Sequence, residues 1–98
     1  IIASGPNNVI LHYIENSQQC YAGDLVLLDV AAEYANYNSD LTRTIPVSGR
    51  FTKRQKEVYQ AVLRIQRQAM KLLRPGIVYF DYQKEIESLM EAELLNLK

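Results

Sequence analysis

Two aspartates stand out because of the residues around them. Asp29 lies within the apolar run 25–32, and Asp40 opens the stretch 40–45, in which polar and apolar residues alternate. A carboxylate inside a buried strand costs free energy unless it is paired or binds a metal ion. The spacing therefore leaves two interpretations open. In the first, both aspartates bind a metal ion. In the second, both are structural: Asp40 caps a strand, and Asp29 is protonated or forms an ion pair with an arginine.

A hairpin would bring the two carboxylates together. If its turn is centred between Tyr34 and Ala35, Asp29 lies directly opposite Asp40, with Cβ atoms about 4.5–5.5 Å apart. Like charges repel at that distance, and one or two divalent cations such as Mg²⁺ or Mn²⁺ would remove the conflict. Thr42 lies two residues past Asp40, hence on the same face, and could orient an oxygen atom that binds the metal. Two carboxylates are too few for a tight site, so other ligands must come from elsewhere.

The elements that would position these residues are strands, followed by helices. We predict strands at 9–13, 25–32 and 40–45 from apolar runs and alternation. A helix is predicted over 53–73, because Thr52 and Gln55 have the spacing of a capping box and Pro75-Gly76 ends the apolar period. A second helix is predicted from about residue 79 to the end. The apolar positions of the first helix are Val58, Val62, Ile65, Ala69 and Leu72.

Composition excludes several classes of protein. The chain has 98 residues, a formal net charge of zero, 48% hydrophobic residues and one cysteine. These values argue against disorder and against a disulfide framework, and no apolar stretch is long enough to span a membrane. No targeting peptide can be recognised, and both ends look cut, so we expect a fragment. The basic residues of 50–75 recur at helical steps opposite the apolar positions, which favours a solvated helix face over a nucleic-acid surface.

Several segments together resemble one enzyme family. The stretches 28–34 (LDVAAEY) and 37–44 (YNSDLTRT) closely resemble the first metal-binding hairpin of Xaa-Pro aminopeptidases (aminopeptidase P) and the related prolidases. The upstream segment with SGPN and LHY, the GRFT motif before the first helix, and RPG after it are also similar to that family. One departure is visible, because Ile77-Val78 stands where the family commonly has a Ser or Thr that caps the next helix. The resemblance covers nearly the whole chain.

The resemblance implies a fold and a set of site residues. The fold class is α/β of the α+β type: part of the pita-bread (creatinase/aminopeptidase) fold, an antiparallel sheet with two helices on one face. Residues 1–98 would form the N-terminal portion of the catalytic domain. By the same match, Asp29 would bind one of two divalent ions, most simply Mn²⁺, and Asp40 would bridge both. His12 would contact substrate and help move a proton, whereas without the match a strand histidine with a satisfied hydrogen bond is favoured.

The implied function is removal of an N-terminal residue that precedes proline. One His and two Glu ligands would come from beyond residue 98, so the isolated chain is expected to be inactive, and the acids of 85–93 are not expected to replace them. The implied partners are peptides with proline at the second position, the rest of the domain and other copies of the chain. No nucleic-acid or membrane partner is expected, and the implied location is cytoplasmic. A prolidase, a non-catalytic peptide-binding relative and a methionine aminopeptidase are the alternatives.

Overall fold

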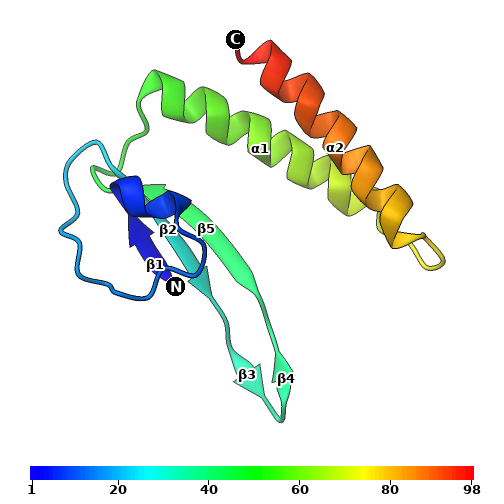
Figure 1. Cartoon of the computed structure of the whole chain (residues 1–98), viewed down its shortest axis with the longest axis horizontal. Helices are drawn as coiled ribbons and strands as arrows, with labels where there is room; N and C mark the ends of the chain where they lie inside the picture. The colour runs from blue at the N-terminus through cyan, green and yellow to red at the C-terminus, as the bar shows by residue number, and fades with distance from the viewer. The chain divides into compact units, whose positions relative to one another are not determined.

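The structure is a computed structural model that describes residues 1–98, and the chain divides into two compact units, 1–52 and 53–98 (Figure 1). No helix is both long enough and apolar enough to cross a membrane. The first unit contains strands and one short 3₁₀ helix, and the second contains two helices. In chain order the elements are β1 (Ile2–Ser4), η1 (Gly5–Val9), β2 (Leu25–Val30), β3 (Glu33–Tyr34), β4 (Tyr37–Asn38), β5 (Leu41–Pro46), α1 (Lys53–Leu72) and α2 (Tyr79–Asn96).

The first unit is built on an antiparallel sheet of three strands in the order β1-β2-β5. The central strand β2 is the Val- and Leu-rich run that the sequence predicts, shortened to Leu25–Val30, and β5 is the alternating stretch. The edge strand β1 has only three residues, too few for a periodicity signal. Its Ala3 and Ser4 are nevertheless 2% and 5% exposed, so this short strand contributes to the core of the unit.

The prediction of a strand at 9–13 is wrong. Residues Gly5–Val9 form the 3₁₀ helix η1, which has proline in its first turn, and the chain after it bends and turns. His12 has a φ of 56°, the left-handed conformation, which cannot continue an extended strand. The apolar run at this point does not mark a buried strand either. Val9 and Leu11 are 90% and 85% exposed, whereas Tyr13 is buried.

Beyond β2 and β5 the hairpin continues into a short second ladder, β3 with β4, which Figure 1 shows at the bottom of the picture. Tyr34 pairs with Tyr37, so the loop consists of Ala35 and Asn36 alone. Their φ values of 52° and 68° are those of a type I′ turn, whose twist matches the strands. Glu33 Oε1 accepts a hydrogen bond from the Asn36 nitrogen and closes the turn.

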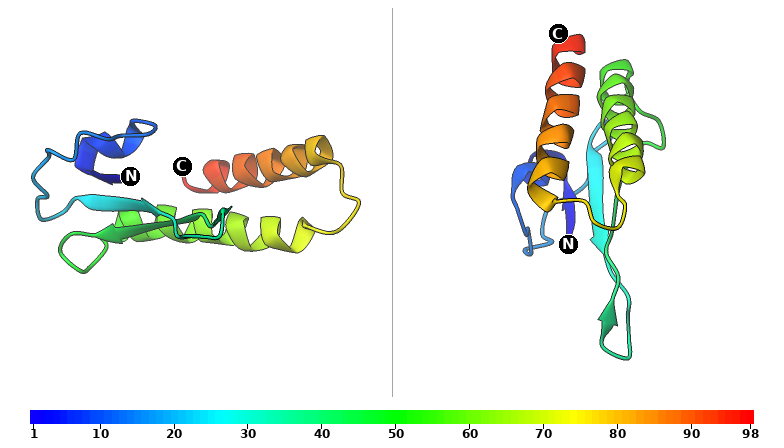
Figure 2. Two further views of the ribbon diagram at one scale, coloured as in Figure 1. Left: turned by 90° about the horizontal axis from the view of Figure 1, so that it is seen from below. Right: turned by 90° about the vertical axis from the view of Figure 1, so that its right-hand side faces the viewer.

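The second unit is a pair of helices that lie side by side and are joined by residues 73–78 (Figure 2). Both predicted helices are confirmed to within one or two residues. The basic residues expected in solvent, Lys53, Lys56, Arg67 and Lys71, are exposed. α2 begins at Tyr79 without a side-chain cap at Val78, so the departure from the family pattern does not shift its start.

The core of this unit repeats every four residues along α1, where Ala61, Ile65 and Ala69 are buried. An ion pair joins the helices: Arg64 Nε and Nη2 donate to the two carboxylate oxygens of Glu93, each at 2.7 Å. The hydrogen bonds from Arg64 lower the pKa of Glu93, and the same bonds raise the pKa of Arg64.

Candidate metal and substrate site

Asp29 faces Thr42 across the β2–β5 ladder, so the expectation that it faces Asp40 is wrong. The cause is the turn. Its centre lies between Ala35 and Asn36, one residue later than expected, and each residue of the first strand therefore meets a partner two positions further along. Ser39 keeps this register between the two ladders, because its Oγ accepts a hydrogen bond from the Ala32 nitrogen at 2.9 Å.

A shift of two residues leaves the face of the sheet unchanged, because side chains alternate with a period of two. Asp40 lies two residues before Thr42, but it precedes β5 and has no partner in the ladder, so the alternation of the strand does not determine where its side chain points. Asp29 is half-buried and Asp40 is exposed. Asp29 therefore has a neutral hydroxyl, and not the Asp40 carboxylate, directly opposite it, which reduces the repulsion between the two acids.

Three of the four predicted site residues line one hollow of about 290 Å³ in the first unit. Asp29 and Thr42 come from the β2–β5 ladder, and His12 comes from the turn that follows η1. Asp40 is not part of its lining. The left-handed φ of His12 is an uncommon conformation for a residue with a side chain, and such conformations gather at functional sites. The structure therefore brings together a carboxylate, a hydroxyl and an imidazole.

Backbone hydrogen bonds fix Asp29 in the sheet. Its nitrogen donates to the Ile1 carbonyl at 2.9 Å, and its carbonyl accepts from the Ile1 nitrogen at 2.8 Å, which extends the β1–β2 ladder by one pair. This leaves only the side chain of Asp29 free to serve a site. That support could not be predicted, because a strand as short as β1 is not recognisable from its pattern.

Asn8 is a residue of this hollow that the sequence prediction missed. Its Nδ2 donates to the Leu25 carbonyl at 2.9 Å, while its Oδ1 is buried and has no partner. A buried acceptor left unpaired costs about 1–3 kcal/mol. Asn8 belongs to the polar stretch 4–8, which by composition indicates only a turn, so nothing in the pattern distinguishes it from its neighbours.

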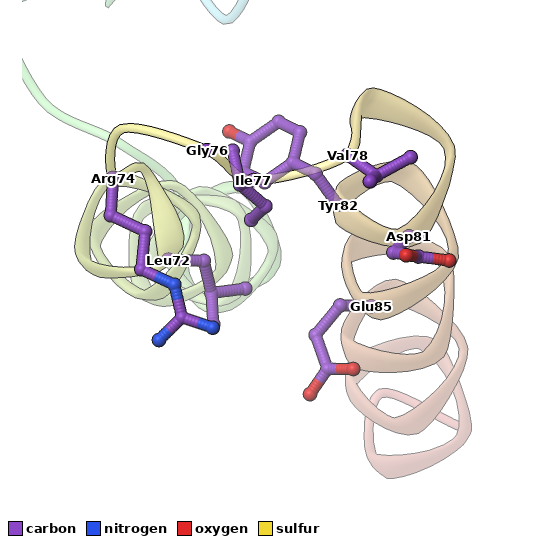
Figure 3. Close-up of a pocket in the computed structure, with 8 residues that line it drawn as sticks. All are labelled: Leu72, Arg74, Gly76, Ile77, Val78, Asp81, Tyr82 and Glu85. Carbon is purple, nitrogen blue, oxygen red and sulfur yellow. The ribbon is translucent and has the colours of Figure 1, made fainter.

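A larger hollow of about 410 Å³ lies in the second unit, where α1 gives way to α2 (Figure 3). Arg74, Asp81 and Glu85 line it, and Figure 3 shows the Arg74 guanidinium and the Glu85 carboxylate extending to the same side. Arg74 forms no ion pair with either acid. The hollow holds no histidine, and its charged groups are exposed on the surface. Its size alone therefore does not make it a candidate for hydrolysis.

The donor set for a metal ion is incomplete within this chain. Nowhere do three His, Cys, Asp or Glu side chains come together so that they could hold a metal ion. Carboxylate oxygens such as those of Asp29 and Asp40 suit hard divalent cations, but such ions take six or more ligands. Glu93 is engaged with Arg64 instead. The two aspartates thus fit one side of a metal centre, and the remaining ligands must come from outside these residues.

Comparison with known proteins shows the family of this chain. The family model for metallopeptidase family M24 matches residues 1–97. The chain belongs to metallopeptidase family M24. It is 42% identical over 97 residues to the Xaa-Pro aminopeptidase of Escherichia coli and 43% identical over 97 residues to Xaa-Pro aminopeptidase 3 of Dictyostelium discoideum. These alignments cover 99% of this chain but 22% and 19% of the two relatives, so the M24 segment spans about a fifth of their length.

Solved structures show the same relationship. Zinc-substituted E. coli aminopeptidase P in complex with product matches with a TM-score of 0.91 and 42% identity, over 98% of this chain and 22% of that one. A glutamate-to-alanine variant of the same enzyme in complex with substrate matches with a TM-score of 0.92. The antiparallel sheet and two helices of this M24 chain therefore correspond to a segment of the pita-bread fold, as the sequence predicts.

Proposed function

We propose that this chain is part of a two-metal M24 aminopeptidase that hydrolyses the bond between an N-terminal residue and proline. The observation that carries the proposal is the common hollow of Asp29, Thr42 and His12 in a chain that belongs to this family. Similarity to Xaa-Pro aminopeptidases over almost the whole chain supports the substrate class. Isolated, the chain would be inactive, because it supplies too few metal ligands.

Each site residue has a separate task. Asp29 would bind one divalent ion and Asp40 would bind both, and Thr42, directly across from Asp29, would orient the ligand oxygens. When bound, the two ions supply the activation of water for hydrolysis and charge neutralisation at the scissile carbonyl. His12 would contact the peptide and hold a proton for transfer, and its place in the lining of the hollow supports this role.

Three finer features belong to the same proposal. The ions would be Mn²⁺, since oxygen-rich ligand sets suit Mg²⁺ and Mn²⁺. The protein would act in the cytoplasm, and it would assemble from several copies. The remaining ligands would come from the rest of a longer catalytic domain, because the matched relatives are about five times the length of this segment.

The experiment is a substrate comparison with the full-length protein. Initial rates are measured with added Mn²⁺ on a tripeptide with proline second, on the matched tripeptide with alanine second, and on the Xaa-Pro dipeptide. We expect preference for the proline tripeptide and loss of activity in EDTA. Preference for the dipeptide would favour a prolidase instead. Absence of hydrolysis, with retained binding of the proline peptide, would favour a non-catalytic relative.

A further inference from the structure

Two close contacts tie the segment before His12 to the strand that contains Asp29. The Asn8 amide donates to the carbonyl of Leu25, the first residue of β2, at 2.9 Å. Gly5 lies so close to Asp24 that a Cβ would sit 3.1 Å from the carboxylate, and its φ of +53° favours glycine. Both contacts join η1 to the start of β2, so they set where the chain leaves η1 toward His12.

The hydrogen bond from Asn8 to Leu25 contributes little net stability. The Leu25 carbonyl determines the orientation of the Asn8 side-chain amide. Rotating this amide by 180° would place Oδ1 against the Leu25 carbonyl, and two acceptors form no hydrogen bond. In the settled orientation Oδ1 is buried and unpaired. The penalty for that acceptor offsets much of the gain from the bond to Leu25. The Asn8 side chain therefore affects the position of η1 more than it affects the stability of the first unit.

The residue whose position depends on η1 is His12. It follows Asn8 by four residues, takes a left-handed conformation and lines the same hollow as Asn8 and Asp29. A single backbone hydrogen bond, from the Ile10 nitrogen to the Asn7 carbonyl at 3.0 Å, braces the intervening chain. A residue in such a conformation keeps its place only if its surroundings hold it there.

We propose that Asn8 is a positioning residue, which through its bond to the Leu25 carbonyl holds His12 beside Asp29 for the reaction. The proposal rests on the proposed function, since it concerns how that site is assembled. Asn8 itself touches no reacting atom and acts through the placement of His12. Its effect must therefore vanish when the imidazole is absent.

A double-mutant cycle in the full-length protein tests this dependence. Asn8→Ala should lower kcat about tenfold on the proline tripeptide and leave KM within about twofold. In a His12→Ala background the same change should alter kcat by less than about twofold. Thermal unfolding should show little difference between wild type and Asn8→Ala. Equal effects of Asn8→Ala in both backgrounds, or no effect on kcat in either, would overturn the proposal.

Two further variants separate the possible reasons for a loss. Asn8→Asp keeps the shape and the acceptors but removes the donor to Leu25, so it should lose as much kcat as Asn8→Ala. If Asn8→Asp instead retains the wild-type kcat while Asn8→Ala loses it, the acceptor is what matters and the positioning role is wrong. Asn96→Ala makes the same change at an exposed position of α2 and should leave kcat unchanged.

The cycle also separates failure of this inference from failure of the proposed function. If wild type hydrolyses the proline tripeptide but the two substitutions act additively, only the positioning role is lost. If wild type does not hydrolyse the peptide at all, the proposed function fails first. The position of His12 can then be followed by the chemical shifts of its ring protons, which Asn8→Ala should move and Asn96→Ala should not.

Discussion

Asp29 lies directly across the β2–β5 ladder from Thr42, and Asp40 lies just before β5, one residue nearer the turn than the last pair of the ladder. The two carboxylates therefore do not lie directly opposite each other. A strand pair can tolerate this arrangement without a bound cation, and the pair of acids remains available to ions that bring further ligands. The hydroxyl opposite Asp29 is neutral and adds no repulsion.

The first prediction concerns the stability of the isolated chain. Asp29→Asn should change its free energy of unfolding by no more than about 0.5 kcal/mol in EDTA, because Asp29 faces a neutral side chain and its sheet bonds are made by the backbone. Denaturant unfolding measures this difference. A loss of more than about 1 kcal/mol would show that the carboxylate is structural there.

A second prediction concerns the turn of the hairpin. Ala35 has a φ of 52°, a conformation that costs a residue with a Cβ about 1–2 kcal/mol. Ala35→Gly should therefore stabilise the chain, by about 0.4–1 kcal/mol after the greater freedom of glycine in the unfolded state is included. Ala32→Gly is the matched control outside the left-handed region and should be neutral or destabilising. If both substitutions destabilise equally, the turn is not of type I′.

A third prediction concerns the buried face of α1. Ile65 is 9% exposed and Val62 is 59% exposed, although both belong to the predicted apolar stripe. Ile65→Ala should destabilise the isolated chain by about 1–4 kcal/mol, whereas Val62→Ala should cost less than about 1 kcal/mol. Lys71→Ala should stay within about 0.5 kcal/mol. Equal losses at Ile65 and Lys71 would mean that the helix buries a different face.

A fourth prediction concerns pH. Because Arg64 lowers the pKa of Glu93, the ion pair stabilises the helix pair at any pH above the ordinary glutamate value of 4.5, and that contribution is lost as the pH falls through the lowered pKa. The melting temperature of wild type should thus exceed that of Glu93→Gln at about pH 7 and approach it at about pH 3. Glu91→Gln is an exposed control on the same helix. A gap between wild type and Glu93→Gln that stays constant with pH would contradict the ion pair.

The sequence predicted well those features that depend on long periodic patterns. Both helices and the two longer strands follow from the spacing of apolar residues. The resemblance pointed to Asp29, Asp40 and His12, and the alternation after Asp40 added Thr42. The predicted register of the hairpin was wrong by two positions, because the Ala-Asn pair of this type I′ turn is a weaker sequence signal than Asn-Gly. Because that slip is even, the shared face of Asp29 and Thr42 was still predicted correctly.

Features that depend on a few residues could not be predicted. β1 has three residues and η1 five, and neither length shows a period. His12 was placed in a strand because Val9, Ile10 and Leu11 precede it, whereas the chain there forms a 3₁₀ helix that contacts β2 and then a left-handed turn. Asn8 acquires its importance from Leu25, seventeen residues away, and no local pattern reports such a contact.

The most direct measurement is the metal content of the full-length protein and its aspartate variants. Mass spectrometry or atomic absorption after dialysis should find two divalent ions per chain in wild type, fewer in Asp29→Asn and fewest in Asp40→Asn. Glu85→Gln, which removes an exposed carboxylate of the hollow in Figure 3, should keep both ions. If Asp29→Asn and Asp40→Asn retain the full metal content, these residues are not ligands and the proposed site is wrong.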